Sequence, residues 1–207
     1  VDIDGAKKNL KVEMPSWNFD IYKAQAIQKW NDELGKIDIQ TSVPALKTTF
    51  YTALYHSFLN PNAFSDVDGR YRGMDNSIHQ DKSRVQYTVF SLWDTFRASH
   101  PLFTLLQSER TTAFIQTFLA QYKEGGILPI WELAGNYTGC MIGYHSIPVI
   151  VDAYIKGYRD FDTELALKAM LYSAEQNHLG LEAYKRSGYI SSEDESESVS
   201  KTLEYAY

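Results

Sequence analysis

The stretch GILPIWELAGNYTGCMIGYHSIPVIVDAYIK, residues 126–156, joins a polar and aromatic loop to a long apolar segment. Between residues 141 and 155 apolar side chains occupy every side of a helical wheel, which predicts a helix that is buried all round. A loop that leads into a rigid buried helix can present polar groups at the floor of a pocket. Taken alone, the stretch favours the simpler interpretation of a core helix with an ordinary connection.

Outward from this stretch, apolar residues recur mainly at helical spacing, and capping residues mark the helix ends. Residues 1–18 show no clear period, which predicts a lead-in strand or loop. Residues 63–91 are mostly polar and are predicted to form an insertion that covers a face of the helical core. This insertion is predicted to hold one short strand at 87–90. Helices are predicted at 21–34 after the cap Asp20, at 43–59, late in 91–106, at 110–122 and from about Ser198. Another is predicted at 161–176, which begins with a cap pattern at Asp162, and 180–189 is predicted to hold one short turn.

The expected fold is therefore all-α, with six or seven helices joined by long polar loops. Strands and helices do not alternate, which argues against a parallel sheet. Alternating buried and amphipathic helices suit a two-layer helical toroid with a concave site at one end. We expect residues 1–207 to be a single segment of a larger protein, because the chain stops at Tyr207 inside a predicted helix.

Composition narrows the function. A net charge of -6 and a pI near 5.4 argue against a nucleic-acid surface, which would gather Lys and Arg. Cys140 is the one cysteine, so no intrachain disulfide or thiolate cluster can form, and we expect a small core residue there. No apolar run reaches the roughly 20 residues that a membrane span requires.

Carboxylates and aromatic residues in loops remain as candidates for chemistry, because phosphate-loop, nucleophile-elbow and HExxH motifs are missing and the five His lack metal-ligand spacing. Such a mixture suits a carbohydrate site, in which an aromatic face packs on the sugar ring while charged groups bind hydroxyls. Simpler roles stay open: Asp94 caps a helix, Arg97 pairs with Asp94, and the Trp residues are core. The candidates are Asp75, Asn76, Trp93, Asp94, Arg97, Trp131, Glu132 and Glu204.

Three long blocks carry a family resemblance: FSLWDTFRASHPL (90–102), WELAGNYTGCMIGYHSIPVIVDAYIKG (131–157) and SVSKTLEYAY (198–207). Together they resemble the signature blocks of glycoside hydrolase family 92, in the family's order. The resemblance implies a calcium-dependent, inverting, exo-acting α-mannosidase that is secreted or periplasmic. It also implies an (α/α)6 toroid of the six-hairpin type, of which this chain is an incomplete middle part. The family's N-terminal β-sandwich lobe and C-terminal helices would lie outside it.

The resemblance also assigns residues. Trp93, Asp94 and Arg97 would line the mannose pocket, Glu204 would lie at the calcium and sugar site as a metal ligand, and Glu182 would lie on the aglycone side. The 1,2-linkage specialists carry a His-Glu pair where this chain has Leu181-Glu182, which weakens a 1,2-specific assignment. The general base would come from an aspartate pair outside this chain.

One position departs from the family pattern. Where many members carry the general-acid Glu, this chain has Tyr137, and a phenol with a pKa of about 10 is a weaker acid than a tuned carboxyl group. Three explanations stay open: Glu132 supplies the proton instead, the leaving group needs little acid, or the protein is weakly active or inactive. The alternative function is therefore a non-catalytic glycan-binding relative that has lost the acid.

Overall fold

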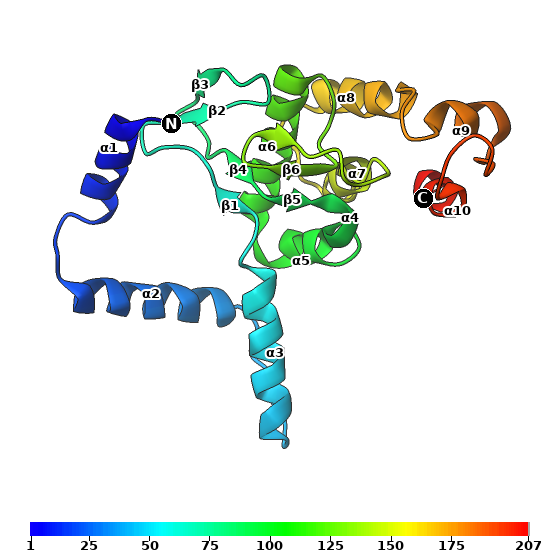
Figure 1. Ribbon diagram of the computed structural model, residues 1–207. Helices are drawn as coiled ribbons and strands as arrows, with labels where there is room; N and C mark the ends of the chain where they lie inside the picture. Colours follow the sequence, from blue (N-terminus) through cyan, green and yellow to red (C-terminus); the bar gives the residue numbers. More distant parts are fainter. Residues whose placement is uncertain (207) are drawn as a thin grey trace.

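The computed structural model describes residues 1–206 and is mostly helical (Figure 1). Within that range the ten helices are α1 (Ile3–Glu13), α2 (Phe19–Leu34), α3 (Pro44–Ser57), α4 (Leu92–Thr95), α5 (Ser99–Leu106), α6 (Ser108–Gly125), α7 (Ser146–Ile155), α8 (Thr163–Glu175), α9 (Leu181–Ser187) and α10 (Ser198–Ala206). None of these described helices is long and apolar enough to cross a membrane.

Seven short strands accompany the helices in the described range: β1 (Asn62–Ala63), β2 (Arg70–Arg72), β3 (Ile78–Gln80), β4 (Tyr87–Thr88), β5 (Phe90–Ser91), β6 (Trp131–Leu133) and β7 (Asn136–Tyr137). They form the antiparallel pairs β1–β4 and β2–β3 and the antiparallel sheet β5-β6-β7. The helical expectation is therefore confirmed, with three small sheets in addition. The predicted strand at 87–90 is split into β4 and β5 by Val89, whose φ is 67°.

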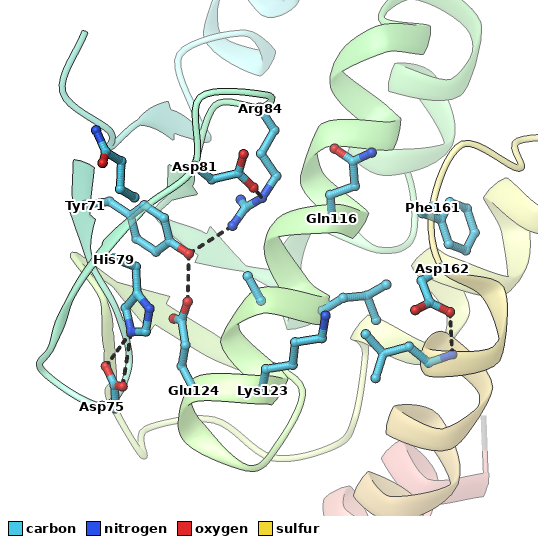
Figure 2. Close-up of a pocket in the computed structure, with 14 residues that line it drawn as sticks. Tyr71, Asp75, His79, Asp81, Arg84, Gln116, Lys123, Glu124, Phe161 and Asp162 are labelled. Carbon is cyan, nitrogen blue, oxygen red and sulfur yellow. Dashed lines mark hydrogen bonds and ion pairs between the residues drawn. The ribbon is translucent and has the colours of Figure 1, made fainter. Parts of the chain in front are cut away.

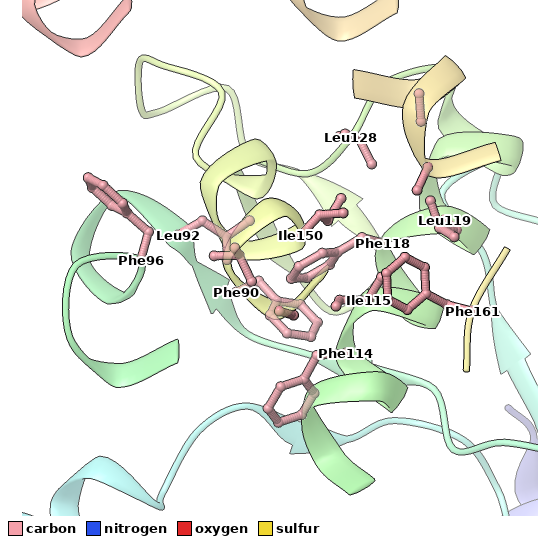
Figure 3. Close-up of a cluster of buried hydrophobic side chains, with 14 of the residues drawn as sticks. Phe90, Leu92, Phe96, Phe114, Ile115, Phe118, Leu119, Leu128, Ile150 and Phe161 are labelled. Atoms are coloured by element: carbon pink, nitrogen blue, oxygen red, sulfur yellow. The ribbon is translucent and has the colours of Figure 1, made fainter. Parts of the chain in front are cut away.

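Helix α6 is the centre of the main core. Its Phe114, Ile115 and Phe118 are each at most 2% exposed, and they pack with Phe90 from β5 and Ile150 from α7 (Figure 3). The Phe90 ring lies edge-on to the Phe114 and Phe118 rings, with centroids 5.6 and 4.8 Å apart. Truncating such a ring typically costs about 3–5 kcal/mol. This core fixes β5, β6 and α7 relative to one another.

The prediction of a helix buried all round over 141–155 is wrong. Helix α7 begins only at Ser146, because Gly143 adopts a left-handed conformation with φ 85°. A Cβ there would lie 2.2 Å from the His145 ring. Val149 and Ile150 face the core, but Ile155 is 76% exposed, so α7 has one buried and one exposed face within this chain.

The N-terminal prediction is also wrong, because residues 3–13 form helix α1. Its N-cap Asp2 accepts a hydrogen bond from the Gly5 N–H at 2.6 Å, and Asn9 donates to Asp66 at 2.8 Å. Only Gly5 is buried in α1, so polar contacts attach this helix to the rest of the protein. The sequence therefore has no apolar stripe here from which a helix could be predicted. Similarly, α2 starts at Phe19 and is capped by Asn18, not by Asp20, and 180–189 holds α9.

Helices α2 and α3 extend away from the body as an arm (Figure 1). They meet through Trp30 and Tyr55, whose rings are 4.5 Å apart, and α2 contributes no buried residue while α3 contributes only Leu54. Within the described residues, α2 and α3 therefore contribute almost nothing to the buried core. The arm leaves large apolar side chains exposed: Trp17, Phe19, Ile21, Ile27, Val43 and Leu46.

Candidate functional site

Three predicted site residues meet where α4 faces α10. The Glu204 Oε1 lies 3.3 Å from the Arg97 Nη2, although 107 positions separate the two residues. The Arg97 guanidinium in turn lies over the Trp93 ring at 5.4 Å. Trp93 is half-buried, and its Nε1 is buried without a hydrogen-bond partner among the described residues. The structure thus brings the 90–102 and 198–207 blocks together.

His145 completes this group, and the sequence did not predict it, because the five His lack metal-ligand spacing. Its Nε2 lies 2.6 Å from the second carboxylate oxygen of Glu204, Oε2. The ring is 2% exposed and lies against the Phe96 ring at 4.4 Å. Burial lowers the pKa of His145, against the opposing effect of Glu204. The only sequence signal was its place at the entry to the apolar segment.

The plane of the Glu204 carboxylate is therefore fixed by a partner on each oxygen. Arg97 and His145 come from separate elements, so rotation of the carboxylate would break at least one contact. A carboxylate offers about four lone-pair directions, which leaves room for a further partner such as a cation or a sugar hydroxyl. We call Trp93, Arg97, His145 and Glu204 the Glu204 cluster.

Asp94 is placed differently from its neighbours. It is exposed, and its Oδ2 accepts a short hydrogen bond from the Ser91 hydroxyl. Helix α4 begins at Leu92 without a side-chain cap, and Arg97 pairs with Glu204. The simpler roles for Asp94, a helix cap and the partner of Arg97, are therefore not what the structure shows. Its carboxylate is open to solvent at the mouth of a cavity.

Glu132 lies at the centre of the β5-β6-β7 sheet and is 0% exposed. Its Oε1 accepts hydrogen bonds from the Thr88 hydroxyl at 2.9 Å and the Gly135 N–H at 2.6 Å, and its Oε2 accepts one from the Val89 N–H at 3.1 Å. Burial raises the pKa of Glu132, although these donors oppose the shift. The carboxylate ties the ends of three strands together and has no exposed surface toward a leaving group.

Tyr137 lies in β7, opposite Glu132 in the strand register, and is 36% exposed. Burial raises its pKa, with the neighbouring Cys140 thiol as a second cause, so the phenol is an even weaker acid than usual. Burial and then Tyr137 also raise the pKa of Tyr205, which follows Glu204 in α10. Tyr137 is thus near the helix that carries Glu204. Cys140 itself is exposed, so the prediction of a core residue is wrong.

Glu182 does not join the other predicted residues. It lies in the first turn of α9 and lines a separate cavity of about 200 Å³ beside Arg186 and Asp194. Leu181, next to it, is 2% exposed and belongs to a small second core with Tyr184 and Tyr205. The structure therefore places Glu182 next to this second core, in a cavity that no residue of the Glu204 cluster lines.

A larger cavity of about 550 Å³ lies between the β2–β3 pair and helices α6 and α8 (Figure 2). The Tyr71 hydroxyl donates to Glu124 at 2.8 Å and accepts from Arg84 at 3.0 Å, and Asp75 pairs with His79 at 3.0 Å. Burial raises the pKa of Tyr71 to about 12. The polar groups satisfy one another, and the cavity is separate from the Glu204 cluster.

A calcium ion in a protein takes six to eight oxygen ligands. Among the described residues no group of three or more His, Cys, Asp and Glu could hold a metal ion. Glu204 can offer one of its remaining lone pairs, but this part of the chain does not form a complete calcium site.

Comparisons with known proteins agree with the earlier resemblance. Residues 5–207 match the model of the glycosyl hydrolase family 92 catalytic domain. A family GH92 alpha-mannosidase from Bacteroides thetaiotaomicron is 43% identical with a TM-score of 0.95, and the match covers 100% of this chain and 28% of that one. The same enzyme with mannoimidazole matches at a TM-score of 0.96, with 43% identity over 100% of this chain and 27% of that one.

A family GH92 inverting mannosidase from the same organism is 33% identical, with a TM-score of 0.92 over 100% of this chain and 29% of that chain. A comparison with curated proteins found no match. The chain spans less than a third of these solved relatives. Because the family model matches nearly every residue, the chain belongs to glycosyl hydrolase family 92.

Proposed function

We propose that the full-length protein hydrolyses terminal α-linked mannose from glycans, with inversion and with the help of calcium. The observation that carries the proposal is the contact between Arg97 and Glu204, which joins two family-matched blocks beside Trp93. The similarity to two mannosidases, one of them solved with mannoimidazole, supports the choice of substrate.

The residues of this chain would bind the sugar, and the general base would come from other parts of the polypeptide. The exposed Asp94 carboxylate can accept hydrogen bonds from vicinal hydroxyls, and the Arg97 guanidinium can donate to them. Inverting hydrolysis needs a base and an acid roughly 6.5–9.5 Å apart so that a water fits between them. Glu182, in the separate cavity of about 200 Å³, is proposed to contact the aglycone.

We also propose that residues 1–207 are an incomplete part of an (α/α)6 toroid. The exposed apolar side chains of α2 and α3, such as Phe19 at 75% and Leu46 at 58%, would pack on the remainder of the protein. That remainder would comprise an N-terminal β-sandwich lobe and further C-terminal helices. Family membership supports a secreted or periplasmic location, which fractionation of cells that express the full gene would test.

The proposal is tested by incubating full-length protein with a mannose disaccharide and an aryl α-mannoside. We expect mannose to be released from at least the aryl substrate, and Asp94→Asn to lower kcat/KM by about 10²-fold because charged hydrogen bonds to the sugar are lost. Unchanged kcat/KM in a folded Asp94→Asn variant would remove Asp94 from the site.

Chelation gives a separate prediction. We propose that Glu204 supplies one calcium ligand and that the others lie outside this chain. Calcium would bind sugar hydroxyls and favour the distorted ring. Incubation with EDTA is therefore expected to abolish mannose release, and added calcium to restore it. Full activity in protein shown by elemental analysis to be metal-free would contradict the calcium proposal.

His145 offers a prediction that does not depend on turnover. Because its Nε2 fixes one oxygen of Glu204, His145→Ala is expected to weaken calcium binding by about 10- to 100-fold, as changes to partners of metal ligands usually do. Calorimetric titration of metal-free full-length protein measures this affinity. His79→Ala, in the separate cavity, is the matched control and should bind calcium as the wild type does. Equal affinities in both variants would exclude His145 from this role.

The alternative is a glycan-binding relative that keeps the pocket but has no efficient acid, and the position of Tyr137 favours it. The pKa of this phenol is raised above its usual value, so it is poorly suited to protonate a leaving oxygen. Wild-type protein that binds mannose but is inert on both substrates supports this alternative. Hydrolysis of the aryl substrate alone supports an enzyme without an efficient acid.

A further inference from the structure

A cavity of about 300 Å³ opens beside Asp94. Its walls come from the end of the α3 connection (Asn60 and Pro61), from the strand and helix that carry Ser91 and Asp94, and from Trp131 in β6. This volume is at the lower end of the range for ligand pockets, roughly 300–1,000 Å³, and suits a single sugar ring.

The sheet register places Trp131 on the same side as Asp94. Ser91 in β5 is paired with Trp131 in β6, while the next pair is Phe90 with Glu132. Paired residues project from the same face of a sheet, and successive residues alternate. Ser91 and Trp131 both line the cavity, as Phe90 does, and the Ser91 hydroxyl donates a hydrogen bond to the Asp94 carboxylate.

The backbone of Trp131 is also fixed. Its carbonyl oxygen accepts hydrogen bonds from the Thr138 hydroxyl at 2.8 Å and the Thr138 N–H at 3.2 Å. The indole is half-buried, so one part of it packs and another part stays accessible. The contacts with Thr138 connect the strand that carries the indole to the end of β7, which holds Tyr137.

The other walls of the cavity fit a neutral polar ligand. His100 is 4% exposed, and burial lowers its pKa to about 4, so it is uncharged at neutral pH. Phe103 supplies apolar surface, and among the described residues that line the cavity Asp94 alone carries a carboxylate. One carboxylate opposite one indole is the arrangement that binds a pyranose, because hydroxyls donate to the carboxylate while the apolar ring face packs on the aromatic ring.

We propose that the cavity beside Asp94 holds one mannose ring and that Trp131 packs on the face of that ring. The inference rests on the proposed function, and it adds a substrate-binding residue from a different block of the chain.

The test uses full-length protein and mannoimidazole as the probe, with binding measured by calorimetry. We expect Trp131→Ala to weaken binding at least about tenfold, since the one aromatic ring that packs on the ligand is lost. Trp131→Phe should stay within about threefold of the wild type, because an aromatic face is retained. Leu133→Ala is the matched control: Leu133 lies on the same strand and face, is 47% exposed and does not line the cavity.

Equal binding by wild type and Trp131→Ala, with unchanged circular dichroism and thermal midpoint, would overturn the inference. If Trp131→Ala does not fold, a crystal structure of the wild type with mannoimidazole decides: the ring lies against the indole, or it lies elsewhere and the inference fails. Loss of binding in Asp94→Asn but not in Trp131→Ala would leave the proposed function standing. A wild type that neither binds the probe nor releases mannose would remove both.

Discussion

In full-length protein, Tyr137→Glu is expected to raise kcat/KM on a mannose disaccharide by about 10²-fold or more, while hydrolysis of an aryl α-mannoside changes little. General acid catalysis typically contributes 10²–10⁴-fold, and the acid works best when its pKa lies near the operating pH. Burial of residue 137 raises the pKa of the phenol further from that range, whereas partial burial of a glutamate would raise its pKa toward it. An aryl leaving group departs without being protonated, so the rate on the aryl substrate does not depend on the general acid.

The control is Tyr137→Gln, which has nearly the shape of the glutamate variant but no acidic proton. It should show no gain on the disaccharide. Gain of the same size in both variants would mean that removing the phenol, not adding an acid, is responsible. A glutamate variant that matches wild type on both substrates would show that residue 137 is not the acid position.

The second large effect is expected at Glu132, where we predict a structural role. Glu132→Ala leaves the Thr88 hydroxyl and the Val89 and Gly135 N–H groups without their acceptor. An unpaired buried donor costs about 1–3 kcal/mol, so the three together should cost about 3 kcal/mol or more. Glu132→Gln keeps one oxygen acceptor and should cost less, because only one donor then meets an amide N–H.

Hydrogen exchange in full-length protein measures this effect locally, which avoids assuming two-state unfolding of a large protein. The segments 88–91 and 131–137 should lose protection in the order wild type, Glu132→Gln, Glu132→Ala, with α8 as the internal control. Equal protection in all three proteins would contradict the structural role. The same glutamine variant tests the acid role of Glu132: hydrolysis of the disaccharide should persist, and its selective loss would restore Glu132 as the acid.

Local features were predictable from the sequence. Phe114 and Phe118 lie one helical turn apart in the predicted helix 110–122, and both are buried in α6. Asp162 accepts a hydrogen bond from the Leu165 N–H at 2.9 Å, which confirms the predicted cap of α8. Such features depend on residues only three or four positions apart, so pattern alone finds them.

Features that depend on distant residues were not predictable. Helix α1 has no apolar stripe because its stability comes from contacts such as Asn9 with Asp66, 57 positions away. The late start of α7 depends on the left-handed Gly143 and on the His145 ring beside it. The contact between His145 and Glu204 spans 59 positions, and a histidine without ligand spacing gave no reason to expect it.

The resemblance to the family predicted some of these contacts between distant residues. It grouped Trp93, Arg97 and Glu204 before any contact was known, and the structure places these three together. It also named Glu182, which the structure puts in another cavity because Gly180, with φ 83°, starts a separate helix beside the second core. The family blocks therefore indicated which residues are candidates for the site, while the packing of the helices determined which of these residues lie in contact.

The most direct test of the central claim is the anomeric form of the first sugar released. Full-length protein with calcium and an aryl α-mannoside is followed by proton NMR from the first minutes, before the free sugar equilibrates between its anomers. The account predicts that β-mannose appears first and that α-mannose grows in only by mutarotation, as an inverting mannosidase requires. The appearance of α-mannose first, or of no mannose at all, would contradict it.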